Sequence, residues 1–294
     1  MLAAPEELAP LVRLTGAVDR LLPARGLAPL AWREPRPDLA VDLHGRGPES
    51  HRLLLATRPR RLVGFDCPAV GHRGPLWDDD EHERVRWCRL VSQTLGVEAD
   101  PGDLRLPAPR GPSTDEAPVL VHPGAAHRSR RWPAERFAEV AAGLASAGHD
   151  VRLTGSRDEV PLAEEVRRRA GLPHAAVAAG RTDLGQLAEL VAGARLVVSG
   201  DTGTAHLATA FGTPSVLLFG PTPPARWGPP ELPRHVVLWK GQRVGDPWAD
   251  EVDPALLDIA VEEVLDSALG LLSAPAGPPA APAAPGRRTT PGSG

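Results

Sequence analysis

The chain contains 294 residues, 42% of them hydrophobic, which is enough for one large or two medium domains with real cores. A formal net charge of −4 gives no bulk electrostatic reason to expect a nucleic-acid partner. No stretch reaches the roughly 20 apolar residues of a membrane span, and the first residues lack the basic and apolar regions of a signal peptide. Neither cysteine, Cys67 or Cys88, follows a metal-binding or disulfide pattern, which favours a reducing compartment.

The first hundred residues alternate short apolar runs with helical patterns. We expect strands at residues 18–22, 39–43 and 61–65, and helices at residues 6–14, 50–57 and 81–95. One face of the last of these helices carries Val85, Cys88, Val91 and Leu95. The alternation is typical of a parallel sheet with crossover helices and predicts an α/β domain over residues 1–100. Proline and charge without periodicity then indicate a linker over residues 101–117.

A second alternating series predicts another α/β domain over residues 118–252. Its strands are expected at residues 119–121, 150–153, 196–198 and 215–219, with a strand region opening at Val177. Its helices are expected at residues 133–147, 160–170 and 184–192, with a further helix starting at Thr204. A last amphipathic helix is expected over residues 253–272, and the Pro/Ala-rich residues 273–294 predict a disordered tail. In such sheets, ligands bind beyond the carboxyl ends of the strands.

The segment between residues 196 and 206 carries the strongest local signal for a ligand. A buried strand stops in Ser-Gly-Asp-Thr-Gly, and helical spacing follows, so the free amides of a helix N-terminus point into a tight loop. Gly200 and Gly203 allow close backbone approach or a positive φ. Asp201 could accept from sugar hydroxyls, and Thr202 and Thr204 could donate to phosphate. The alternative is an ordinary strand–helix turn with Thr as N-cap and Asp as turn former.

Several motifs, in order along the chain, together resemble glycosyltransferase family 9, the heptosyltransferase family that uses ADP-heptose. The first donor loop of the family is similar to His122-Pro123-Gly124-Ala125 followed by Arg130-Arg131-Trp132-Pro133. Its most specific motif is similar to the residues from Ser199 to Ala208, and its Gly-Pro-Thr segment to Phe219-Gly220-Pro221-Thr222. Residues 38–45 and 60–65, in the first half of the chain, also resemble segments of this family.

The resemblance implies a GT-B fold, in which two Rossmann-like domains with parallel sheets face a cleft. The second domain would bind the nucleotide sugar and the first the acceptor. Arg130 takes the place of a basic residue, usually Lys, on the phosphate side of the donor, and Arg suits phosphate. Thr182 and Leu184 would flank the base. The rest of the implied donor site comprises backbone amides of Gly124, Ala125 and Ala126, together with Asp201, Thr202, Gly203, Thr204 and His206.

The implied reaction is an inverting transfer that needs no metal and no cofactor. Arg130 and helix N-terminal amides would stabilise the leaving diphosphate, with Asp201 and His206 beside them, and a general base should deprotonate the acceptor hydroxyl. The sequence departs from the family here, because it begins after the strand and Gly-x-x-Gly-Asp loop whose Asp is the favoured base. We therefore expect an incomplete first domain. Asp42 and His44, at the end of a strand, are weaker candidates on the acceptor side.

Three functional hypotheses follow. The leading one is a glycosyltransferase that moves a sugar, expected to be a heptose, from an ADP-sugar to a glycan or glycolipid in lipopolysaccharide core biosynthesis. The second is a non-catalytic nucleotide-sugar-binding remnant, and the third is another GT-B-like enzyme such as a sugar-nucleotide epimerase. We expect a cytoplasmic monomer without a nucleic-acid partner; contact with the inner face of the cell membrane is left open.

Overall fold

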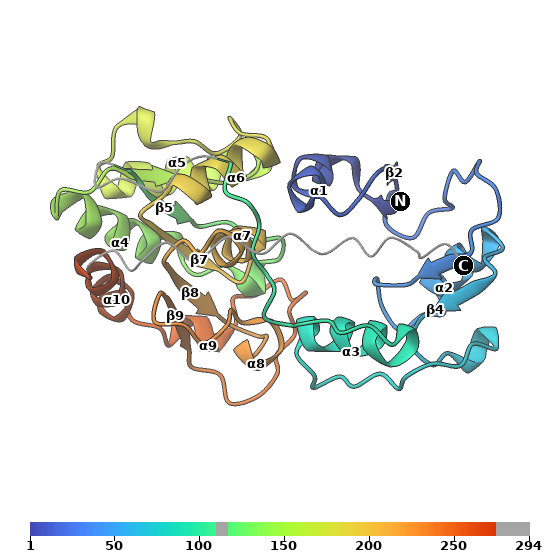
Figure 1. The fold of residues 1–294 in the computed structure, drawn as a ribbon. Helices are drawn as coiled ribbons and strands as arrows, with labels where there is room; N and C mark the ends of the chain where they lie inside the picture. The colour runs from blue at the N-terminus through green and yellow to red at the C-terminus, as the bar shows by residue number, and fades with distance from the viewer. Residues whose placement is uncertain (110–116, 275–294) are drawn as a thin grey trace.

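Two sets of parallel strands, one in each half of the chain, form the framework of the computed structural model, which describes residues 1–109 and 117–274 (Figure 1). In the first half, β1 (Leu2–Ala4) pairs with β2 (Leu21–Pro23), and β3 (Leu39–Val41) pairs with β4 (Arg61–Val63). These are two separate two-stranded parallel sheets. The α-helices of this half are α1 (Ala9–Thr15), α2 (Glu49–Ala56) and α3 (Glu83–Leu95).

The second half forms a five-stranded parallel sheet of order β6-β5-β7-β8-β9. Its strands are β5 (Val119–His122), β6 (Val151–Leu153), β7 (Leu196–Gly200), β8 (Ser215–Phe219) and β9 (His235–Trp239). The helices are α4 (Ala134–Ser146), α5 (Val160–Ala170), α6 (Leu184–Gly193), α7 (Gly203–Phe211), α8 (Pro224–Trp227), α9 (Pro254–Leu257) and α10 (Val261–Ser273). Because β6 and β7 lie on opposite sides of β5, the direction of winding reverses between β5 and β7.

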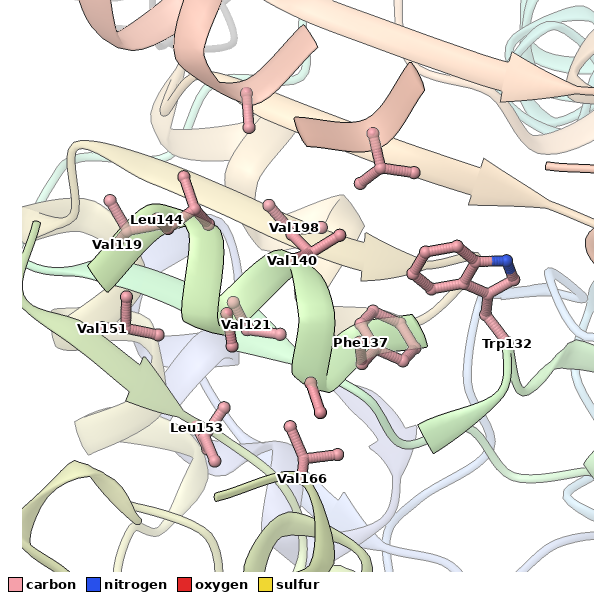
Figure 2. Packing of buried hydrophobic residues seen from close by; sticks show 14 of the residues in the cluster. Val119, Val121, Trp132, Phe137, Val140, Leu144, Val151, Leu153, Val166 and Val198 are labelled. Atoms are coloured by element: carbon pink, nitrogen blue, oxygen red, sulfur yellow. The ribbon is translucent and has the colours of Figure 1, made fainter. Parts of the chain in front are cut away.

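The core of the second domain is built by alternation along its strands. In β5, Val119 and Val121 face one apolar cluster, whereas Leu120 faces another on the opposite side of the sheet. Figure 2 shows the first cluster, in which Phe137, Val140 and Leu144 of α4 pack over the strands and Trp132 closes one end. The opposite face is covered by α6 and α7. The result is a three-layer sandwich, with helices on both faces of a parallel sheet.

Contacts between the two domains involve α1 on one side and α3 on the other. Leu11 and Leu14 of α1 pack with Leu184 and Leu187 of α6 in one apolar cluster. On the other side, α3 lies against α8, and His82 just before α3 reaches the backbone of Gly228. Figure 1 shows α1 and α3 as the elements of the first domain that lie closest to the second. The parallel α/β architecture expected from the sequence is confirmed.

Several expected elements differ from those observed. The strand expected at 18–22 runs from Leu21 to Pro23, and the strand region at Val177 is only a bridge to Leu153. β9 was not expected. The C-terminal helix breaks at residues 258–260, where Asp253 caps the short α9 and Glu263 caps the start of α10. Residues 110–116 of the linker and 275–294 of the expected tail lie outside the described residues.

The expected buried face of α3 is wrong in part. Val85 is 37% exposed, and the buried positions are Arg86 and Leu90. Arg86 can be buried because it pairs with Glu83, donates to the Asp78 and Glu81 carbonyls, and stacks 4.0 Å over the Trp77 ring. Apolar spacing alone does not reveal a buried cation that a carboxylate, two carbonyl oxygens and an aromatic ring hold in place.

Candidate functional site

The main candidate residues come together beyond the carboxyl ends of β5 and β7, the position at which a sheet of this type has its ligand-binding crevice. These strands are hydrogen-bonded neighbours, with His122 opposite Ser199 at their ends. They are also the two strands between which the winding reverses, which is where a doubly wound sheet leaves room for a ligand. The loop after β5 carries Arg130, and the loop after β7 carries Asp201. The fold itself therefore places these two side chains at one site.

The loop from β7 to α7 presents a helix N-terminus with unused hydrogen-bonding groups. Thr202 occupies the N-cap position in an extended conformation, and its side chain makes no capping hydrogen bond. Its Oγ1 is buried without a partner. The space where Gly203 would carry a side chain is open. The Thr202 hydroxyl is therefore available to a bound group or to a water molecule.

The structure explains why residue 200 is a glycine, a question that the sequence alone left open. A Cβ at this position would lie 3.1 Å from the Arg130 carbonyl oxygen, so the glycine lets the loop after β5 approach β7 closely. Its φ is not positive. Within that loop, Arg131 Nε donates to the Ala125 carbonyl at 2.7 Å, which ties its two ends together. Ser129 Oγ and Arg130 Nε are buried without hydrogen-bond partners.

Asp201, His206 and Arg130 interact electrostatically. Asp201 is only 9% exposed. Burial raises the pKa of the Asp201 carboxyl, while the neighbouring His206 and Arg130 act in the opposite direction. A buried carboxylate beside two cationic or potentially cationic groups is costly for folding and is typical of functional sites. The three residues that the resemblance assigns to the donor site thus lie close enough together for His206 and Arg130 to act on the carboxyl of Asp201.

Two polar residues at this crevice were missed as candidates from the sequence. Glu159 lies directly over Gly124, since a Cβ on that glycine would overlap the Glu159 carboxylate. Glu159 Oε2 also accepts from the Ser156 amide at 2.8 Å. His122, at the end of β5, is 8% exposed and lies 3.0 Å from Thr154 Oγ1, and burial lowers its pKa. A Ser-x-x-Glu pattern indicates an ordinary capping box, so only the fold reveals that this carboxylate also faces the donor loop.

The other residues that the resemblance assigns to the donor site differ in their burial and in their contacts. Ala125 is buried and Ala126 exposed in the loop after β5. Thr182 is half-buried just before the capping box of α6, where Asp183 accepts from the Gln186 amide. Leu184 instead packs in the apolar cluster shared by α6 and α1. Its contact with a base therefore remains a prediction, while its packing role is observed.

The acceptor-side candidates separate into one buried and one exposed residue. Asp42 is 2% exposed, and its Oδ2 lies 2.8 Å from His51 Nδ1. Its Oδ1 accepts from the His44 amide at 2.9 Å. On its other edge, His51 Nε2 lies 3.0 Å from the Phe65 carbonyl oxygen. Both oxygens of Asp42 are thus engaged inside the first domain, which assigns Asp42 a structural role, whereas His44 is exposed.

A metal-binding cluster and a membrane-spanning helix were both sought in the described ranges. Within residues 1–109 and 117–274, no three His, Cys, Asp or Glu side chains gather into a group that could hold a metal ion. Asp78 and Asp80 form an Asp-x-Asp pair in the first domain, where Asp80 pairs with Arg226 of α8. A bilayer-crossing helix is absent from the same part of the chain.

Comparisons with known proteins give a consistent family. Residues 77–247 match the family model of glycosyltransferase family 9 (heptosyltransferase). The chain is 37% identical over 215 residues to lipopolysaccharide heptosyltransferase 1 of Pseudomonas aeruginosa, covering 71% of this chain and 56% of that protein. It is 32% identical over 155 residues to lipooligosaccharide heptosyltransferase 2 of Haemophilus influenzae, covering 49% and 44%. The chain thus spans about half the length of the curated relatives that it matches.

Solved structures resemble this fold at low sequence identity. The ADP-heptose lps heptosyltransferase II of Escherichia coli superposes with a TM-score of 0.70 at 22% identity, covering 92% of this chain and 88% of that one. The glycosyl transferase family 9 protein of Veillonella parvula gives a TM-score of 0.73 at 19% identity, covering 92% and 87%. The GT-B fold expected from the resemblance is confirmed. Because the family model covers more than half of the chain, this protein belongs to glycosyltransferase family 9.

Proposed function

We propose that this chain binds an ADP-sugar, with a heptose as the sugar, in the crevice between β5 and β7. The observation that supports this most directly is that Thr202 Oγ1, next to Asp201 in the chain, and Arg130 Nε, whose side chain acts electrostatically on Asp201, are both buried without a hydrogen-bond partner. Groups of this kind occur where a ligand supplies the missing hydrogen bonds. The heptosyltransferase WaaC of Escherichia coli, similar in fold, has been solved with ADP and with ADP-2-deoxy-2-fluoro heptose.

The chemistry of the crevice suits a nucleoside diphosphate sugar. Arg130 can pair with phosphate oxygens through its planar fork, and the free amides at the start of α7 suit the same anion. Asp201 and Glu159 are acceptors for hydroxyl groups, and His206 is a further polar contact. As the bond to the sugar breaks, negative charge grows on the diphosphate, and Arg130 with the α7 amides would stabilise it without a metal.

The reaction we propose is transfer of the sugar, with inversion, to a hydroxyl group of a glycan or glycolipid acceptor of the lipopolysaccharide core. Relatives named lipopolysaccharide and lipooligosaccharide heptosyltransferases support this acceptor class. The acceptor would approach from the first domain. The proposed place of action is the cytoplasmic side of the cell membrane. We assign no catalytic base, because Asp42 is already held by His51.

A transfer assay tests this proposal. The 294-residue chain is incubated with ADP-heptose and a heptose-deficient lipopolysaccharide acceptor, with and without EDTA, and both ADP and the glycosylated product are measured. We expect product of inverted anomeric configuration and equal rates with EDTA. ADP-heptose binding without transfer would instead favour the nucleotide-sugar-binding remnant. A strict metal requirement or a preference for UDP- or GDP-sugars would contradict the proposed donor chemistry.

A further inference from the structure

His82 of the first domain reaches across to the second domain in a defined protonation state. Its Nδ1 accepts a hydrogen bond from the Arg84 amide at 3.3 Å and so caps α3. Its Nε2 lies 2.9 Å from the Gly228 carbonyl oxygen. A carbonyl oxygen only accepts, so Nε2 carries the proton and donates. Burial also lowers the pKa of His82, which keeps the ring neutral.

The partner of His82 belongs to a segment that contacts the proposed donor site. Gly228 directly follows α8, whose last residue is Trp227. The centroid of the Trp227 ring lies 6.2 Å from that of His206. On the other side of Trp227, Arg226 pairs with Asp80 of the first domain. The residues before and after Trp227 are therefore both held from the first domain.

We propose that His82 is a positioning residue for the sugar end of the donor site: by holding Gly228, it fixes α8 so that Trp227 stands beside His206. This inference rests on the proposed function. Trp227 is 41% exposed, and an indole face next to an imidazole suits the C–H face of a pyranose ring with hydroxyls at its edge. The contacts proposed for the nucleotide end are separate from these, at Arg130 and the start of α7. His82 therefore affects recognition of the sugar more than recognition of ADP.

The hydrogen bond from His82 is one of the contacts that join α8 to the first domain. This helix has only four residues, too few to be stable by itself. An open groove of about 680 Å³ runs beside it between His82, Arg84 and the segment 228–237, so apolar packing there is incomplete. The Arg226–Asp80 pair holds α8 from the same domain, but its Asp80 side chain is 89% exposed, so we expect it to contribute less than the hydrogen bond from His82.

Two substitutions separate the two roles of the imidazole. His82→Asn keeps a good N-cap for α3 but is too short to reach Gly228. His82→Gln can still donate to Gly228 through its amide. His174→Asn, at a side chain 81% exposed in the second domain, is the matched control. Calorimetry measures the dissociation constants of ADP and ADP-heptose for each protein, and thermal melting checks folding.

We expect His82→Asn to weaken ADP-heptose binding by about three- to tenfold, the worth of one net hydrogen bond, with ADP binding and melting nearly unchanged. His82→Gln should restore the affinity, Trp227→Ala should show the same selective loss, and His174→Asn should change neither constant. Three results would overturn this inference but leave the proposed function standing. They are an equal loss of affinity for ADP and ADP-heptose, no loss of affinity for either, and no rescue of ADP-heptose binding by His82→Gln. A wild-type chain that binds neither ligand would overturn the proposed function and this inference with it.

Discussion

His235 should make the stability of the second domain depend on pH. It lies in β9, is 8% exposed, and its Nδ1 is 2.8 Å from Ser215 Oγ. Burial, with help from Arg234 and Arg105, lowers its pKa from 6.5 to about 4. The unfolded chain therefore binds a proton between pH 6.5 and 4 that the folded chain does not. The contribution of His235 to stability is complete above pH 6.5 and is lost as the pH falls toward 4.

The size of this effect follows from the pKa difference. At about 1.36 kcal/mol per pKa unit, the limit is about 3 kcal/mol, and partial screening by solvent reduces the expected value to about 2 kcal/mol. Urea unfolding at pH 7 and at pH 4.5, followed by tryptophan fluorescence, measures it in wild type and in His235→Gln. Burial also lowers the pKa values of His82, His122 and His149. These histidines therefore contribute to the fall in the free energy of unfolding that is measured for the wild type. The difference between the two proteins isolates His235, and equal pH dependence in both would refute the reasoning.

Substitutions at three further positions test the residue assignments in the two domains. Asp42→Ala leaves His51 buried without its partner and should cost about 3–5 kcal/mol in urea unfolding, with ADP affinity retained; a stable variant without transfer activity would instead make Asp42 catalytic. Gly124→Ala forces the Glu159 carboxylate aside, so ADP-heptose should bind about tenfold more weakly by calorimetry, and normal affinity would place the donor elsewhere. Arg130→Ala should lose about 1.5–3 kcal/mol of ADP binding, with Arg130→Lys retaining part of it; equal loss in both would show that charge alone is not what Arg130 provides.

That Asp201 and His206 lie close together was predictable from the sequence because the signals are local. Asp201 and His206 lie within one strand–loop–helix segment, and the sequence shows the end of the strand, the glycines and the start of the helix together. Glu159 was missed because its pattern indicates a helix cap, and only the tertiary structure brings its side chain over Gly124. His82 was missed for the same reason, since its partner Gly228 is 146 residues away.

Other elements depended on tertiary contacts that no local pattern carries. β9 was not expected because its apolar residues follow a proline-rich segment, and its strand character comes from pairing with β8. Asp42 looked like an acceptor-side candidate from its place at a strand end. Its contact with His51 of α2, inside the first domain, shows why strand-end carboxylates are often structural.

Titration of ADP-heptose into wild type and Asp201→Ala tests the central claim that the crevice between β5 and β7 binds the donor. The carboxyl of Asp201 is buried at a cost to folding, so its removal should leave the melting temperature unchanged or raise it. If Asp201 accepts from the donor, the variant should lose about 1.5–3 kcal/mol of binding, roughly ten- to a hundredfold in the dissociation constant. Equal affinity in the two proteins, or a variant that unfolds while its folded fraction binds normally, would contradict the account.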